Sequence, residues 1–135
     1  MIRTLGGLAW GIGVAILVMM LVEAAGNQLY PPPVGLDLER PDAAFRMPFR
    51  TLIFPVLGWF LGPLAGGMIA IRVSGRRWAS WPVAAVVLVG AIVQFALAGY
   101  PLWMIAAGLA APPAAALLAQ LLVRPRAGDL AADPD

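Results

Sequence analysis

Histidine, cysteine and lysine are all absent from this chain of 135 residues, and only 12% of its residues are charged. Without cysteine there is no disulfide or thiol nucleophile, and without histidine there is no imidazole base or axial haem ligand. Without lysine there is no Schiff-base chemistry. The nine arginines and seven acids lie almost entirely at the ends of apolar segments. The sequence therefore predicts a protein that is not an enzyme and that needs no cofactor or metal.

Apolar residues dominate what is present. They make up 61% of the chain, and the mean hydropathy is +0.87, whereas soluble domains are about 45–50% apolar. The isoelectric point near 9.9 reflects a net charge of only +2. The arginines lie where a bilayer would place them, so we expect the lipid bilayer as a partner and no nucleic acid.

Four apolar segments are each long enough to cross the hydrocarbon core as a helix, which takes about 20 residues. We expect helices at about 5–25, 51–72, 79–98 and 101–123. Their apolar residues do not alternate with polar ones, and only helices or closed barrels span a bilayer. The predicted fold is all-α: a polytopic membrane protein, with residues 1–123 forming a single four-transmembrane-helix bundle. Residues 124–135 are expected to be a disordered cytoplasmic tail.

The distribution of arginine predicts the orientation. One side of the four spans carries six arginines and no acid close to the membrane, namely Arg3, Arg72, Arg76, Arg77, Arg124 and Arg126. The positive-inside rule then places both termini in the cytoplasm and the loop 26–50 outside. Arginine and alanine usage is similar to that of high-GC bacteria, so we expect the bacterial inner membrane. A signal peptide cleaved near Ala24 is the less favoured alternative, because Glu23 interrupts the cleavage pattern.

The outer loop is long for a connection between two antiparallel helices, which usually takes about 2–8 residues. Its Tyr30 is followed by three prolines, which make a rigid backbone, and we expect this segment to fold back over the outer end of the bundle. A short interfacial helix is predicted at 41–47, with Phe45 and Phe49 pointing inward.

A glycine face runs along the second predicted helix. Close helix contact through small residues drives association in lipid, and the spacing resembles a glycine zipper. The first reading is packing within the bundle; the second is a homo-oligomer or docking to a larger membrane complex. The glycines concerned are Gly58, Gly62, Gly66 and Gly67 in the second helix and Gly7 and Gly11 in the first.

Glu23 is the acid that lies at the end of a predicted span. An intramembrane acid is a functional candidate, but near an interface it can also anchor a loop by pairing with an arginine. We expect it to be covered by the loop and to pair with Arg46 or Arg50, with an ion or proton site as the alternative. Gln94 is expected to form a hydrogen bond across the bundle.

Several short motifs resemble a family of small bacterial four-helix membrane proteins with no assigned activity. The similar segments are Val22-Glu23, Tyr30-Pro31-Pro32-Pro33, Gly35-Leu36-Asp37, Pro41-Asp42-Ala43, Gly66-Gly67 with Ala70 and Arg72, and Tyr100-Pro101-Leu102-Trp103. The resemblance covers residues 5 to about 123. It implies the four-helix fold and adds nothing about function.

Two functional hypotheses follow from these residues. The first is a non-enzymatic accessory or scaffold subunit, or a homo-oligomer, that associates through its small-residue helix faces. The second is a small transporter or channel for a cation, a proton or a lipid-like molecule, with Glu23 at its site.

Overall fold

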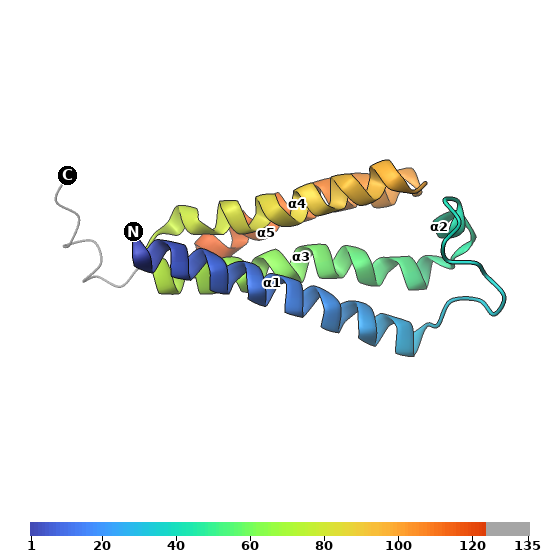
Figure 1. The fold of residues 1–135 in the computed structure, drawn as a ribbon, viewed down its shortest axis with the longest axis horizontal. Helices are drawn as coiled ribbons and strands as arrows, with labels where there is room; N and C mark the ends of the chain where they lie inside the picture. Colours follow the sequence, from blue (N-terminus) through green and yellow to red (C-terminus); the bar gives the residue numbers. More distant parts are fainter. Residues whose placement is uncertain (124–135) are drawn as a thin grey trace.

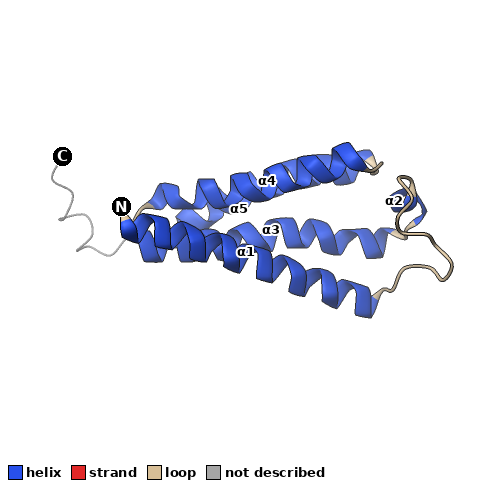
Figure 2. Cartoon of the chain, in the orientation of Figure 1, coloured by secondary structure: helices blue, strands red, loops and turns tan. Residues whose placement is uncertain are grey.

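The computed structural model describes residues 1–123, which form helices and turns with no strand among them (Figure 2). The helices are α1 (Ile2–Leu29), α2 (Ala43–Arg46), α3 (Phe49–Ser74), the 3-10 helix η1 (Arg77–Ala79), α4 (Ser80–Leu97) and α5 (Leu102–Leu122). Four helical segments are long and apolar enough to cross a membrane, with η1 and α4 counted together. The prediction of an all-helical chain with four such helices is confirmed. The tail predicted at 124–135 lies outside the described residues.

The ends of two helices follow from local backbone chemistry. α1 continues to Leu29, beyond the expected end near residue 25, and Tyr30 leaves the helix with φ −136° and ψ 74°. Pro31 explains this position, because a proline disfavours helical backbone at the preceding residue. α3 ends at Gly75, whose φ of 74° is left-handed and whose N–H donates to the Ile71 carbonyl at 2.8 Å. Glycine adopts this conformation without steric cost.

Figure 1 shows α1 beside α3 and α4 beside α5, which we call the two helix pairs, and α3 also packs extensively on α5. The pairs lie close together near the N-terminus and separate toward the other end, which carries α2. We call this the loop end. α1 packs far more extensively on α3 than on α4. The bundle is therefore tight at one end and open between α1 and α4 at the other.

Glycines allow the close approach of α1 and α3. A Cβ atom on Gly66 would overlap the carbonyl oxygen of Gly11, and one on Gly11 would lie 2.7 Å from the carbonyl oxygen of Gly66. Ala15 and Ala70, which flank this crossing, are buried. Backbone therefore meets backbone here, and a larger residue at either glycine would force the helices apart.

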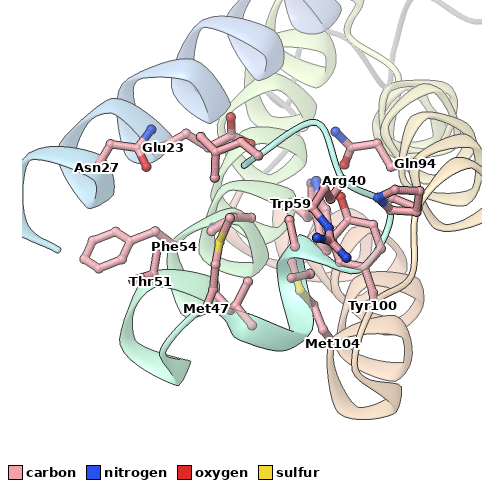
Figure 3. Close-up of a pocket in the computed structure, with 17 residues that line it drawn as sticks. Glu23, Asn27, Arg40, Met47, Thr51, Phe54, Trp59, Gln94, Tyr100 and Met104 are labelled. Carbon is pink, nitrogen blue, oxygen red and sulfur yellow. The ribbon is translucent and has the colours of Figure 1, made fainter. Parts of the chain in front are cut away.

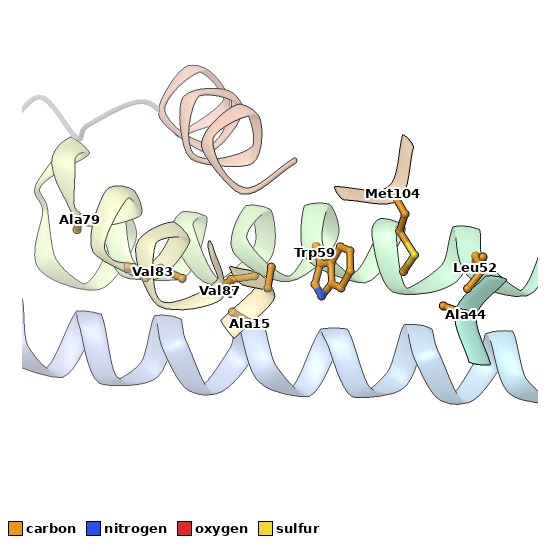
Figure 4. Close-up of a cluster of buried hydrophobic side chains, with 10 residues drawn as sticks. Ala15, Ala44, Leu52, Trp59, Ala79, Val83, Val87 and Met104 are labelled. Carbon is orange, nitrogen blue, oxygen red and sulfur yellow. The ribbon is translucent and has the colours of Figure 1, made fainter. Parts of the chain in front are cut away.

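The buried core runs along α3 and joins the two helix pairs (Figure 4). Trp59 of α3 is at its centre and is 2% exposed. Ala15 of α1, Val83 and Val87 of α4, and Met104 of α5 pack into the same cluster. The core thus draws on all four long helices.

Polar side chains join α4 and α5 at the N-terminal end. The Gln120 side-chain amide donates to the Ser80 hydroxyl at 3.1 Å, and the Arg77 guanidinium donates to the Gln120 carbonyl at 2.8 Å. Ser80 is fully buried. These bonds link the start of α4 to the end of α5 and help to keep this end of the bundle closed.

Candidate ligand-binding cavity at the loop end

Between the two helix pairs, the loop end holds a cavity of about 220 Å³, which we call the loop-end cavity. Residues from α1, α3, α4, α5 and the connection between α1 and α3 line it (Figure 3). Apolar residues such as Trp59 and Met104 form much of its wall. Its polar lining residues are Glu23, Asn27, Arg40, Thr51, Gln94 and Tyr100.

α1 contributes Glu23 and Asn27, which are four residues apart and so share one face of the helix. Gly26 between them is buried, and a Cβ there would overlap the ring of Phe54. The glycine lets this end of α1 sit on α3. Within residues 1–123, neither Glu23 nor Asn27 forms a side-chain hydrogen bond or an ion pair. Both polar groups therefore face the cavity without a protein partner.

Gln94 approaches from the opposite side, on α4 (Figure 3). The prediction that it bonds across the bundle is wrong, because its side chain makes no hydrogen bond within the described residues. The separation of α1 from α4 at this end is the physical reason. The glutamine that does bond between helices is Gln120, at the closed end.

The predicted pairing of Glu23 with Arg46 or Arg50 is also wrong. Arg46 donates instead at 3.1 Å to Asp42, four residues earlier, at the N-cap of the same short helix. Arg50 is exposed and has no ion pair among residues 1–123. The arginine that lines the cavity with Glu23 is Arg40. Arg40 in turn bonds to Asp42 at 3.0 Å, because local pairs are easier to form than a pair across the cavity.

The Arg40–Asp42–Arg46 cluster carries a net charge of +1. Hydrogen bonding from Arg40 lowers the pKa of Asp42 below its ordinary value, and the positive charges of Arg40 and Arg46 act in the same direction. Asp42 is therefore ionised at neutral pH. Of the two arginines that share Asp42, Arg40 is the one that lines the cavity.

The loop covers the cavity with a different segment from the one predicted. Tyr30 and two of the three prolines are exposed. Tyr30 caps the end of α1 and packs on α3, where its ring lies near Phe54 and its carbonyl accepts a bond from the Thr51 hydroxyl at 3.3 Å. The segment that crosses the loop end is 38–47, and the Gly99 N–H donates to the Pro41 carbonyl at 2.7 Å. This bond fastens the loop to the turn between α4 and α5.

The short helix in the loop turns its alanines to the bundle. Ala43 and Ala44 are its buried residues. Phe45 and Phe49 are 62% and 59% exposed, so neither ring is buried within the bundle, and their orientation toward the membrane stays a prediction. Small alanines allow α2 to lie close to the helix ends, and the phenylalanine rings are left at the surface, where Phe49 stacks on Trp103 at 4.8 Å between ring centroids.

Aromatic rings form the wall of the cavity beside α5. Phe95 lies edge-on to Trp59 at 5.3 Å and to Tyr100 at 5.4 Å. Gly108 of α5 makes room for this stack, because a Cβ there would lie 2.6 Å from the Phe95 ring. Burial raises the pKa of Tyr100 above its ordinary value of 10.0, and the negative charge of Glu23 raises it further. Glu23 and Tyr100 therefore act on one another across the cavity.

The ionisation of Tyr100 gives a direct test of this geometry. In a Tyr30→Phe variant Tyr100 is the single tyrosine, and we expect its phenol to titrate above 10.0 in absorbance at 295 nm. Adding Glu23→Gln should lower the midpoint without restoring the ordinary value, since burial is the larger cause. Asp37→Asn, at an exposed acid in the loop, is the matched control and should leave the Tyr100 midpoint unchanged. A midpoint insensitive to Glu23→Gln would show that Glu23 does not face Tyr100.

The predicted glycine face lies inside the fold. Five of the six glycines lie at the α1–α3 contact. Gly67 instead faces Ser80 of α4 and Ala119 of α5, where a Cβ would lie 3.1 and 3.3 Å from their Cβ atoms. A Cβ on Gly62 would lie 2.6 Å from Met19, whereas one on Gly58 would make an ordinary contact at 3.6 Å. The five at the α1–α3 contact are Gly7, Gly11, Gly58, Gly62 and Gly66.

A second space of about 220 Å³, which we call the side groove, lies between α1 and α4. Ile16 and Met19 line it from α1, and Val86 and Gly90 line it from α4. A Cβ on Gly90 would meet no atom within 4 Å. Nothing in the sequence pattern distinguished Gly90, because its importance depends on a helix distant in the chain.

The loop-end cavity provides hydrogen-bond acceptors, donors and one charge of each sign around an apolar wall. This is the composition of a recognition site for a small molecule. Among residues 1–123 there is no group of three acidic, histidine or cysteine residues placed to hold a metal ion. Comparison with known proteins finds no matching family model, curated protein or solved structure. The family resemblance seen in the sequence stays a prediction.

Proposed function

We propose that the chain is a non-enzymatic integral membrane protein that binds a small ligand in the loop-end cavity. Four helical segments with the length and hydropathy of membrane spans support the membrane assignment. The positive-inside rule, applied to the arginines, favours both termini in the cytoplasm of a bacterial inner membrane. The loop end then faces outward, with Glu23 near the outer surface of the bilayer.

The glycine face favours this proposal over a scaffold role. α1 covers Gly62 and Gly66 of α3 so closely that no further side chain fits between the helices. A partner helix could use that face only after α1 had left it. The small residues that suggested association therefore account for the packing of the bundle itself.

The observation that carries the proposal is a set of polar side chains with no protein partner. Glu23, Asn27 and Gln94 face one cavity and make no side-chain hydrogen bond within residues 1–123. Asn27 and Gln94 are exposed and Glu23 is partly exposed, so water or a ligand can reach all three groups. Their convergence on one space leaves donors and acceptors free for a ligand. Glu23 would accept hydrogen bonds from positive or donor groups of the ligand, and the amides of Asn27 and Gln94 would orient the ligand.

Thiol labelling tests this proposal directly, because the chain contains no cysteine. A single thiol introduced by Gln94→Cys should react with the cationic reagent aminoethyl methanethiosulfonate in vesicles. The matched control is Ile92→Cys, which lies two residues earlier on α4 with an exposed side chain outside both spaces. We expect at least about tenfold faster reaction at position 94, because apolar surroundings suppress the reactive thiolate at position 92.

The same assay tests the role of Glu23. Adding Glu23→Gln to the Gln94→Cys variant should slow the cationic reagent by about three- to tenfold, since a nearby carboxylate concentrates cations. The reaction of a neutral methanethiosulfonate should not change. Equal rates at positions 92 and 94 would contradict the proposal, because the cavity would then be closed to polar molecules.

A further inference from the structure

We propose that the loop-end cavity and the side groove together bind one phospholipid with a zwitterionic headgroup that bears a primary ammonium, as in phosphatidylethanolamine. The headgroup would occupy the loop-end cavity, and an acyl chain would leave it through the side groove between α1 and α4. This inference rests on the proposed function and names its ligand class.

The two spaces adjoin one another. Glu23, Trp59 and Gln94 line both of them, so the polar cavity continues into the groove. Each has a volume of about 220 Å³, and together they fall in the range of about 300–1,000 Å³ that is typical of small-molecule sites. A ligand that fills both must be polar at one end and apolar at the other.

The groove has the chemistry of a site for an acyl chain. Ile16 and Met19 on one side and Val86 and Ala91 on the other are apolar. Gly90 leaves the α4 wall without a side chain, and the few contacts between α1 and α4 leave the groove open sideways. In a bilayer, this side faces lipid, so a phospholipid could enter without leaving the membrane.

The charges in the cavity are complementary to a zwitterion. Glu23 provides a carboxylate without an ion pair among residues 1–123, and Gln94 adds an amide oxygen. Both accept hydrogen bonds, which a primary ammonium donates and a quaternary one cannot. Arg40 holds Asp42 through Nε and Nη2, so the donors of Nη1 are available to a phosphate. The positive charge of Arg40, which lines the cavity, favours the phosphate on that side.

Trp59 offers a reporter for the bound chain. It lines both spaces and is 2% exposed, so lipid around the outside of the bundle has little access to it. A single-tryptophan protein, made by replacing the other four tryptophans with phenylalanine, would be reconstituted in phosphatidylglycerol vesicles. Its fluorescence would be measured as dibrominated phosphatidylethanolamine replaces the host lipid, and compared with dibrominated phosphatidylglycerol.

We expect the ethanolamine lipid to quench Trp59 with at least about fivefold higher apparent affinity than the glycerol lipid. Glu23→Gln and Arg40→Gln should each remove most of that preference. Gly90→Leu should weaken quenching by both lipids, because its side chain would extend into the groove from a position where an added Cβ meets no atom within 4 Å. Gly13→Leu is the matched control: a Cβ at Gly13 also meets no atom within 4 Å, but Gly13 lines neither space.

Three outcomes would overturn the inference. Equal quenching by both lipids would mean that the groove takes acyl chains without selecting a headgroup. Stronger quenching by the glycerol lipid would mean that Arg40 alone selects an anion. Absence of quenching would mean that no chain enters the groove. In each case, faster thiol reaction at position 94 than at position 92 would leave the proposed polar site standing, so the two failures can be told apart.

Discussion

Replacing Gly66 with alanine should destabilise the bundle by about 1–3 kcal/mol, the usual cost of forcing extra volume into a packed contact. The added Cβ would overlap the carbonyl oxygen of Gly11 and lie 2.8 Å from the Cβ of Ala15. Both atoms belong to residues of α1, so the whole helix must move to make room for the added Cβ. The free energy of unfolding can be measured by circular dichroism as SDS is added to the protein in dodecyl maltoside.

Gly58→Ala is the matched control in the same helix. Its Cβ would lie 3.6 Å from the nearest atoms of Met19, an ordinary contact. Replacing a helical glycine by alanine where there is room stabilises a protein by about 0.4–1 kcal/mol. The two variants should therefore change stability in opposite directions. Equal effects would show that α1 does not cross α3 at Gly66.

Replacing Trp59 with alanine should cost about 3 kcal/mol, the lower end of the range for a buried tryptophan. The lower end applies because lipid is as apolar as the core, so the loss is mainly one of packing. The ring stacks edge-on against Phe95 and belongs to the core that joins the four long helices. The same SDS titration measures the effect.

The control for this prediction is Trp10→Ala. Trp10 lies on α1 and is 68% exposed, so it has little packing to lose within the bundle. A change within about 0.5 kcal/mol is expected, as for other surface substitutions. If Trp59→Ala cost no more than Trp10→Ala, the core along α3 would not hold the two helix pairs together.

Several features of the candidate site could be predicted in part. Glu23 and Gln94 were recognisable because an acid and an amide are rare within apolar segments, and both line the loop-end cavity. Their partners were predicted incorrectly. Arg46 was expected to reach Glu23, but Asp42 lies four residues away at the N-cap of the same short helix and pairs with Arg46 instead. Arg40 was not recognised, because three arginines in one loop look alike in sequence.

The sequence by itself determined that four long apolar helices form, and local residues explain where two of them end. That information is local: hydropathy adds up along a segment, and Pro31 and Gly75 end their helices through their own backbone preferences. The tertiary structure alone decided which helices pair closely and which stay apart. Pairing depends on whether residues far apart in the chain, such as Gly11 and Gly66, come into register. The opening between α1 and α4, and with it the cavity that contains Glu23 and Gln94, is a consequence of that non-local packing.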